Sequence, residues 1–152
     1  MDGMTLRRYL AFDLEGSVYA IDVERVEVVL EMVPVTRVPR SSEHLRGVIN
    51  HRGTVIPVAD LRVRFGEGLT DLAKAGSIIV MQLHQGSDSV TIGILADSVR
   101  EVIDFDSSKI ERAPAFGKGG LDKMVQGVYG NEGAFIVVLD VDKVFEDLSD
   151  EL

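Results

Sequence analysis

The chain has 152 residues, of which 45% are hydrophobic and 27% charged, and a formal net charge of −9. This composition is typical of a soluble protein with one domain or two very small ones. The acidic excess argues against nucleic-acid binding, which draws on clustered Lys and Arg. There is no cysteine, so disulfides, thiolate catalysis and thiolate metal sites are excluded.

No stretch approaches the roughly 18 consecutive apolar residues that a membrane-spanning helix needs. The first eight residues also lack the apolar segment of a secretory signal. We therefore expect a cytoplasmic protein that does not insert directly into a membrane.

Short apolar stretches, separated by Gly, Asp, Asn and Ser, predict a mainly β protein. In chain order, strands are predicted at residues 9–14, 18–21, 26–32, 47–49, 54–58, 77–83, 90–95, 99–103, 124–129 and 134–139. One helical turn is predicted within residues 39–46, and residues 104–122 are rich in turns. A C-terminal helix is predicted after the N-cap residue Asp140, because four apolar residues follow at helical spacing: Val141, Val144, Phe145 and Leu148.

The sequence contains an internal repeat. Residues 47–61 align without a gap with residues 127–141, and six of the fifteen positions are identical, where about one would match by chance. A second pair of segments, residues 20–26 and 93–99, is similar in the same order. The repeat predicts two similar β-units, covering about residues 15–75 and 76–148, with the N-terminal strand a candidate for sharing between them.

The two copies differ at the tip of one predicted hairpin, where Arg52 aligns with Glu132. Gly53 and Gly133 recur there because glycine adopts positive φ without strain. The turn therefore does not require arginine, which leaves two interpretations of Arg52: a solvated surface charge or a recognition contact. Pro57 lacks a backbone donor, which indicates an edge strand or a bulge.

Catalytic and metal sites are not indicated. His44, His51 and His84 do not have the spacing of metal ligands, and the glycine-rich residues 117–120 lack the phosphate-loop pattern. Recurring aspartates at residues 60 and 140 stand where a strand gives way to a helix, so capping explains them better than catalysis. We expect no catalytic, cofactor-binding or metal-binding residue and no enzyme activity.

The repeated segment carries a resemblance to a known family. Residues 47–61 read G-V-I-N-x-R-G-x-x-I-P-V-x-D-L, which closely resembles the signature of the CheW-like coupling proteins of bacterial chemotaxis. Residues 19–29 and 92–99 are also similar to that family, and the similarity spans residues 8–148. The resemblance implies one CheW-like domain built of two tandem SH3-like five-stranded barrels packed together, with short helices.

Members of that family are non-enzymatic adaptors without a cofactor. The resemblance implies that this chain links the cytoplasmic tips of chemoreceptors to the regulatory domain of a histidine kinase, and is recruited to receptor arrays at the membrane. The implied receptor-binding residues are Val26, Val28, Asn50, Arg52, Gly53 and Val99. The implied kinase-binding residues are Glu111, Ala115 and Phe116.

The chain departs from the family pattern at two of these positions and at one residue beside them. Glu111 and Ala115 do not match the family's charge pattern, and His51 stands where leucine is usual. The histidine is either tolerated in a solvated turn or makes receptor affinity depend on pH. The strand valines, Val26 and Val28, are open to interpretation as core residues.

Two alternative functions remain open at this point. One is a CheW-like scaffold in a related surface-sensing, gliding or twitching motility pathway. The other, from a different class, is a small β-barrel that binds nucleic acid. The acidic charge and the absence of Trp count against the second alternative.

Overall fold

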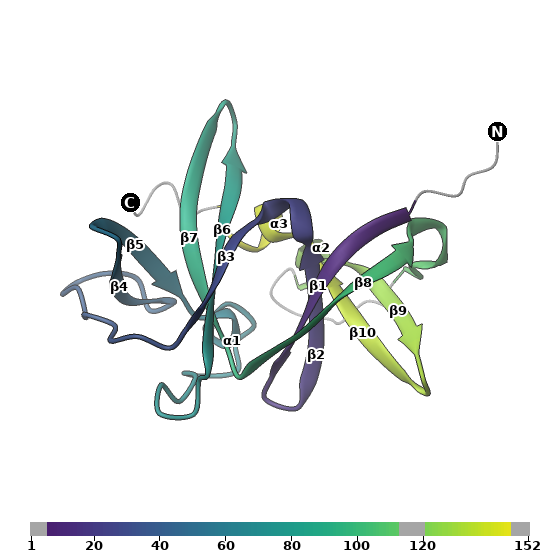
Figure 1. Ribbon diagram of the computed structural model, residues 1–152, viewed down its shortest axis with the longest axis horizontal. Helices are drawn as coiled ribbons and strands as arrows, with labels where there is room; N and C mark the ends of the chain where they lie inside the picture. The colour runs from purple at the N-terminus through teal and green to yellow at the C-terminus, as the bar shows by residue number, and fades with distance from the viewer. Residues whose placement is uncertain (1–5, 113–120, 147–152) are drawn as a thin grey trace.

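The computed structural model describes residues 6–112 and 121–146. These residues form two five-stranded sheets, drawn side by side in Figure 1. Sheet A has the order β8 (Ser98–Asp106), β1 (Leu6–Leu14), β2 (Ser17–Asp22), β10 (Ala134–Leu139) and β9 (Val125–Asn131). Sheet B has the order β3 (Val26–Glu31), β6 (Ser77–Gln85), β7 (Asp88–Ala96), β5 (Thr54–Ala59) and β4 (Leu45–His51). The prediction of a mainly β fold is confirmed.

The helices are short. They are the 3-10 helices η1 (Val23–Arg25) and η2 (Ser107–Lys109), and the α-helices α1 (Leu61–Arg64), α2 (Leu121–Met124) and α3 (Val141–Val144). Residues 39–46 form turns and the start of β4 in place of the predicted helical turn. The C-terminal helix is confirmed through Val144, and Leu148 lies outside the described residues. Helix α2 was not predicted.

Each sheet combines strands from both halves of the sequence. Strand β2 pairs in parallel with β10, and β5 pairs in parallel with β7. The predicted division at about residue 75 is therefore not the division between the sheets, since residues 17–22 lie in sheet A and residues 77–96 in sheet B. A repeat locates similar segments but does not say which strands pair, and parallel pairing requires long crossover connections.

The repeat itself is visible in equivalent hydrogen bonds. Thr36, in the segment after β3, exchanges two backbone hydrogen bonds of 2.8 Å with Val48 of β4, and Glu111, after β8, does the same with Val128 of β9. Because β3 and β4 are the two edges of sheet B, and β8 and β9 those of sheet A, these bridges join the edges of each sheet. Each sheet is thereby closed into a small barrel.

One repeated glycine explains how the bridges fit. A Cβ atom on Gly47 would lie 2.1 Å from the Thr36 carbonyl oxygen, and one on Gly127 would lie 2.5 Å from the Glu111 carbonyl oxygen. Any larger residue would push the bridging segment away from the barrel. The identity at these two positions therefore reflects a close backbone approach.

The barrels pack through two hairpins that are buried on both faces. In β1, Tyr9 belongs to the sheet A core, whereas Leu10 and Phe12 belong to a core shared by both sheets. In β6, Ile78 points into the sheet B core and Ile79 into the shared core. Strands buried on both faces have nearly continuous apolar sequences. The shared core, which also contains side chains of α1 and α3, joins the barrels into one body.

Pro57 lies in β5, which is an inner strand between β7 and β4, so the prediction of an edge strand is wrong for the sheet order. Its partner in β4 is Val48, and the pairing of β5 with β7 begins only at Val58. Pro57, which has no backbone N–H to donate, thus lies just before the hydrogen-bonded pairing of β5 with β7 begins.

Candidate protein-contact site

The β4–β5 hairpin ends in a two-residue turn. Arg52 and Gly53 have φ angles of 54° and 84°, and the equivalent Glu132 and Gly133 have 50° and 85°. Positive φ at both central residues is the geometry of a type I′ turn, which matches the twist of a hairpin. The same turn thus forms with either charge. The tip is shorter than the gap at residues 50–53 between the predicted strands, because residues 50 and 51 still pair within the ladder.

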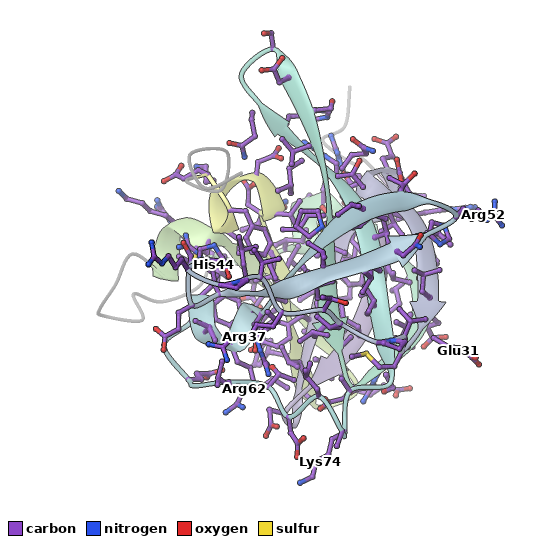
Figure 2. All side chains as sticks on the ribbon, turned by 90° about the vertical axis from the view of Figure 1, so that its left-hand side faces the viewer. Glu31, Arg37, His44, Arg52, Arg62 and Lys74 are labelled. Atoms are coloured by element: carbon purple, nitrogen blue, oxygen red, sulfur yellow. The ribbon has the colours of Figure 1, made fainter. Side chains whose placement is uncertain are left out.

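The Arg52 side chain is exposed and points outward at the end of the hairpin in Figure 2. Within residues 6–112 and 121–146, its guanidinium takes part in no hydrogen bond or ion pair. Asn50 is also exposed, and its Oδ1 accepts a hydrogen bond of 2.8 Å from the Gly53 backbone N–H. Asn50 therefore stabilises the turn from within, whereas all five donors of Arg52 are available.

Each of the two equivalent hairpins has an exposed apolar residue close to its turn. Val55, paired with Asn50, is 68% exposed, and the equivalent Phe135 of the other hairpin is 60% exposed. Sequence reasoning missed both residues. The available signal was their alternation with the buried Ile56 and Ile136 on the opposite face of each strand.

The three predicted receptor-binding valines are only partly exposed. Val26 and Val99 pack against the shared core, and Val28 packs against the sheet B core. Both strands that carry them, β3 and β8, are edges in the sheet order. More exposed on these strands are Val29 and Val102, at 40% and 49%, which the sequence reasoning did not select.

The predicted kinase-binding loop is only partly described. Glu111 is exposed, and its backbone N–H and C=O both bond to Val128, so the main chain is held while the side chain faces solvent. Ala115 and Phe116 lie outside the described residues. Glu111 belongs to the sheet A barrel, whereas the Arg52 hairpin belongs to the sheet B barrel.

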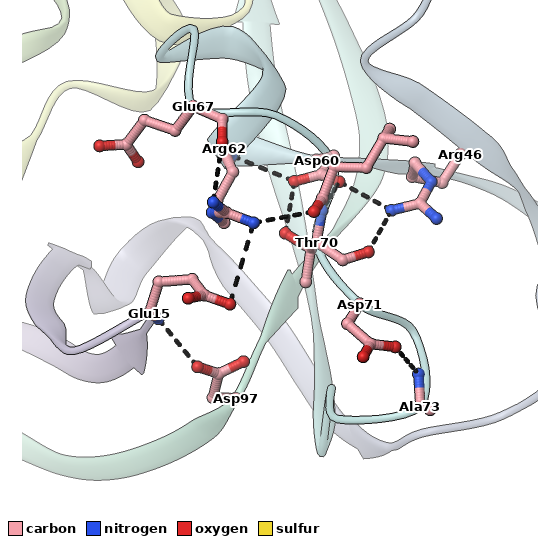
Figure 3. A network of polar contacts seen from close by, with 10 residues as sticks. Glu15, Arg46, Asp60, Arg62, Glu67, Thr70, Asp71, Ala73 and Asp97 are labelled. Carbon is pink, nitrogen blue, oxygen red and sulfur yellow. Dashed lines mark hydrogen bonds and ion pairs between the residues drawn. The ribbon is translucent and has the colours of Figure 1, made fainter.

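Asp60 is the centre of a buried polar network (Figure 3). It caps α1 by accepting from the Arg62 backbone N–H at 3.1 Å, as predicted. Its carboxylate also accepts from the Arg46 guanidinium at 2.8 Å and from the Thr70 backbone N–H and hydroxyl at 2.8 and 2.6 Å. Asp140 caps α3 and makes no comparable network among the described residues. Asp60 therefore also fastens Thr70, in the segment between α1 and β6.

Other polar contacts connect the barrels. Arg64 in α1 donates from Nε to the Val144 carbonyl oxygen of α3 at 2.8 Å. The Asp142 carboxylate accepts from the Arg25 guanidinium and from the His84 backbone N–H, the latter at 2.8 Å. These contacts add directional constraints to the apolar packing between the barrels.

A second carboxylate, that of Asp13, is held next to the turn of the β1–β2 hairpin. Asp13 accepts from Arg100 Nε at 2.9 and 3.0 Å and from the Ser98 hydroxyl at 2.9 Å. The hydrogen bond from Arg100 lowers the pKa of Asp13 below its ordinary range.

The described residues contain no group of three or more His, Asp or Glu side chains that could hold a metal ion. None of the helices in the described ranges is long and apolar enough to span a membrane. Two closed barrels fixed to each other, with an unpaired charged hairpin tip, define a β-barrel protein suited to protein contacts.

Comparisons with known proteins agree with this class. The CheW-like domain family matches residues 8–149. The chemotaxis protein CheW of Thermotoga maritima is 33% identical over 140 residues, which cover 92% of this chain and 88% of that protein. CheW of Bacillus subtilis is 28% identical over 147 residues, covering 97% and 92%. The crystal structure of the scaffolding protein TtCheW from Thermoanaerobacter tengcongensis superposes with a TM-score of 0.77 at 29% identity, covering 93% and 89%.

The chain belongs to the CheW-like family. It is accordingly a chemotaxis scaffold protein and not an enzyme.

Proposed function

We propose that this scaffold couples the cytoplasmic tips of chemoreceptors to the regulatory domain of a histidine kinase, as one CheW-like domain spanning residues 8–148. Membership of the family supports the general role. The observation that carries the specific proposal is the free guanidinium of Arg52. The equivalent turn of the other barrel has the same backbone geometry with Glu132 in that position. Recruitment to membrane receptor arrays follows from receptor binding.

Receptor binding is assigned to the β4–β5 hairpin tip and to the edge strands β3 and β8. The Arg52 fork donates to a carboxylate or to free carbonyls at a receptor helix end. Gly53, exposed and without a side chain, allows the partner to approach the turn. The apolar part of the contact is assigned to the exposed edges of Val26, Val28 and Val99, with Asn50 keeping the turn in shape.

Kinase binding is assigned to a different face, the loop that begins at Glu111 and includes Ala115 and Phe116. The support is that this loop leaves the sheet A barrel, whereas Arg52 is on the sheet B barrel. Phe116 falls in the stretch that the sequence predicts to be rich in turns, and an aromatic residue there is a common kind of anchor for a protein partner. The two partners can then bind the same molecule at once.

The experiment is a pull-down with a purified chemoreceptor cytoplasmic fragment and the kinase regulatory domain, added separately and together. The unsubstituted chain should retain both partners in one complex. Phe116→Ser should weaken retention of the kinase domain and leave the receptor fragment bound. Equal loss of both partners would contradict separate faces, and retention of neither by the unsubstituted chain would contradict the coupling role.

A further inference from the structure

The segment between β3 and β4 forms a pocket of about 490 Å³ with the segment between α1 and β6. We call it the arginine pocket, because Arg37, Arg40 and Arg46 all line it. Its described lining includes neither the hairpin tip at Arg52 nor the loop that begins at residue 111. In Figure 2, Arg37 and Arg52 are on opposite sides of the view. The pocket is therefore separate from the residues to which receptor and kinase binding were assigned above.

Hydrogen bonds hold the two walls of the pocket in place. In one wall, the Ser41 hydroxyl donates to the Val38 carbonyl oxygen at 2.8 Å. Arg46 joins this wall to the other, because its guanidinium donates to the Thr70 carbonyl oxygen at 2.6 Å and to the Asp60 carboxylate at 2.8 Å. The same carboxylate accepts from the Thr70 backbone N–H. A pocket whose walls are already fixed loses little conformational entropy when it is filled.

The second half of the sequence lacks this arrangement. Arg46 is the residue left out of register between β4 and β5, and Gln126 holds the same place between β9 and β10. Gln126 donates to the Tyr9 hydroxyl at 3.5 Å. Asp140, the equivalent of Asp60, makes no comparable network among the described residues. The arrangement around Arg46 is thus particular to the sheet B barrel and is not a requirement of the fold.

The charge of the pocket is opposite to that of the chain as a whole, which has a net charge of −9. Arg37 and Arg40 are exposed, and no hydrogen bond or ion pair joins either to any other described residue. Glu43 is the one acidic residue among the described lining residues. Two free guanidiniums therefore offer paired donors to carboxylates from outside the molecule.

The pocket also presents apolar side chains from both walls. Val38 is 40% exposed and Leu69 is 56% exposed. Val35, Leu45 and Leu72 add partly exposed apolar surface to the lining. Inorganic anions and sugar phosphates have no group that suits such surface. A peptide with an apolar side chain next to its carboxylates matches both the charge and the apolar part of the pocket.

We propose that the arginine pocket binds an acidic peptide segment of a partner protein, with carboxylates at Arg37 and Arg40 and an apolar side chain between Val38 and Leu69. Because the guanidiniums are exposed, salt weakens this binding. Glu43 repels carboxylates and so limits how many the segment carries. Since the segment does not cover Arg52, a scaffold with its hairpin tip occupied can still hold this further partner.

The test is the binding of dye-labelled peptides to the full chain, measured by fluorescence anisotropy. The peptide G-E-L-E-L-E-G should bind, and more weakly as salt is added. Arg37→Glu with Arg40→Glu should weaken it about tenfold, because two attractions become repulsions. Glu43→Gln should strengthen it. The matched control is Arg112→Glu, which follows the equivalent backbone bridge of the other barrel and should leave the affinity nearly unchanged.

Other ligands separate the possible occupants. The peptides G-E-S-E-S-E-G and G-Q-L-Q-L-Q-G, without apolar side chains and without carboxylates respectively, should each bind more weakly than the first peptide. Tripolyphosphate and vesicles that contain phosphatidylserine should compete poorly with it, because they offer anionic groups without a matching apolar side chain.

Three outcomes would overturn the proposal. The first is that the unsubstituted chain does not bind G-E-L-E-L-E-G, and the second is binding that survives the reversal of Arg37 and Arg40. The third is that the serine peptide, tripolyphosphate or the vesicles bind as tightly, which would make the pocket a general anion site. The melting temperature of each variant reports its folding, so lost binding is separable from unfolding. No receptor or kinase is present, so these results do not depend on the coupling function.

Discussion

The Arg25 guanidinium and the Asp142 carboxylate form an ion pair with two hydrogen bonds, of 2.6 and 3.3 Å, between the barrels. Arg25 ends the 3-10 helix that leads into β3 of sheet B, and Asp142 lies in α3, which follows β10 of sheet A. The side chains are 24% and 27% exposed. The pair therefore fixes the start of a proposed receptor-binding strand relative to the other barrel.

This relationship predicts a measurable coupling energy. A double-mutant cycle with Arg25→Ala and Asp142→Ala, followed by urea unfolding, should give a favourable coupling of about 1 kcal/mol. The matched control is the pair Arg8–Asp104, which has one hydrogen bond of 3.1 Å and side chains 71% and 61% exposed. The control should show almost no coupling, and equal coupling for both pairs would refute the assigned role.

The free hairpin tip predicts a loss of binding without a loss of stability. Arg52→Glu should weaken receptor-fragment binding by about 1–3 kcal/mol, as expected for a lost charge-assisted contact, when measured by titration calorimetry. Its melting temperature should not change, because the equivalent turn already carries Glu132.

Glu132→Arg is the matched control for that substitution, and it should preserve both binding and melting temperature. A marked fall in the melting temperature of Arg52→Glu would show that the arginine is structural. Unchanged affinity would remove Arg52 from the receptor contact.

The two capping aspartates should differ in their contribution to stability. Asp60→Ala removes a fully buried carboxylate and leaves the partly buried Arg46 guanidinium without its partner, and breaking a buried ion pair in this way costs about 3–5 kcal/mol. Asp140→Ala removes only a cap, which costs about 1 kcal/mol. Urea unfolding of both variants measures the difference, and similar losses would mean that the Asp60 network adds little.

Asp13 predicts a dependence of stability on acid pH. Hydrogen bonding to Arg100 lowers the pKa of Asp13 in the folded state below its ordinary value of 3.8. The resulting stabilisation is fully present above pH 3.8 and is lost as the pH falls through the folded-state pKa. Between pH 5 and pH 2.5, the free energy of unfolding should fall less in Asp13→Asn than in the unsubstituted chain. Parallel curves for the two proteins would contradict this account.

Local structure was largely predictable from sequence, because it depends on neighbouring residues. Alternating and continuous apolar stretches indicated the strands, glycines marked the turns, and aspartates marked the starts of α1 and α3. The pairing of β2 with β10 and of β5 with β7 was not predictable, since parallel partners are distant in sequence. Helix α2 was missed because its four residues are too few to show a helical period.

The candidate site was predictable to a similar extent. The substitution of Glu132 for Arg52 in the repeat correctly indicated that the turn does not need arginine. The additional role of Asp60 could not be foreseen, since it depends on Arg46 and Thr70 meeting in space. The sequence also could not show whether Val55 is exposed or buried, because that depends on which face of its strand points toward the core.

The exchange of strands between the two halves of the sequence also has a consequence for biosynthesis. The first 76 residues include two strands of one barrel and three of the other, and therefore complete neither. On the ribosome, the sheet B barrel can close once β7 has emerged, whereas the sheet A barrel must wait for β10. Two fragments divided at residue 76 should thus remain unfolded separately and acquire structure when mixed, as mutual complements.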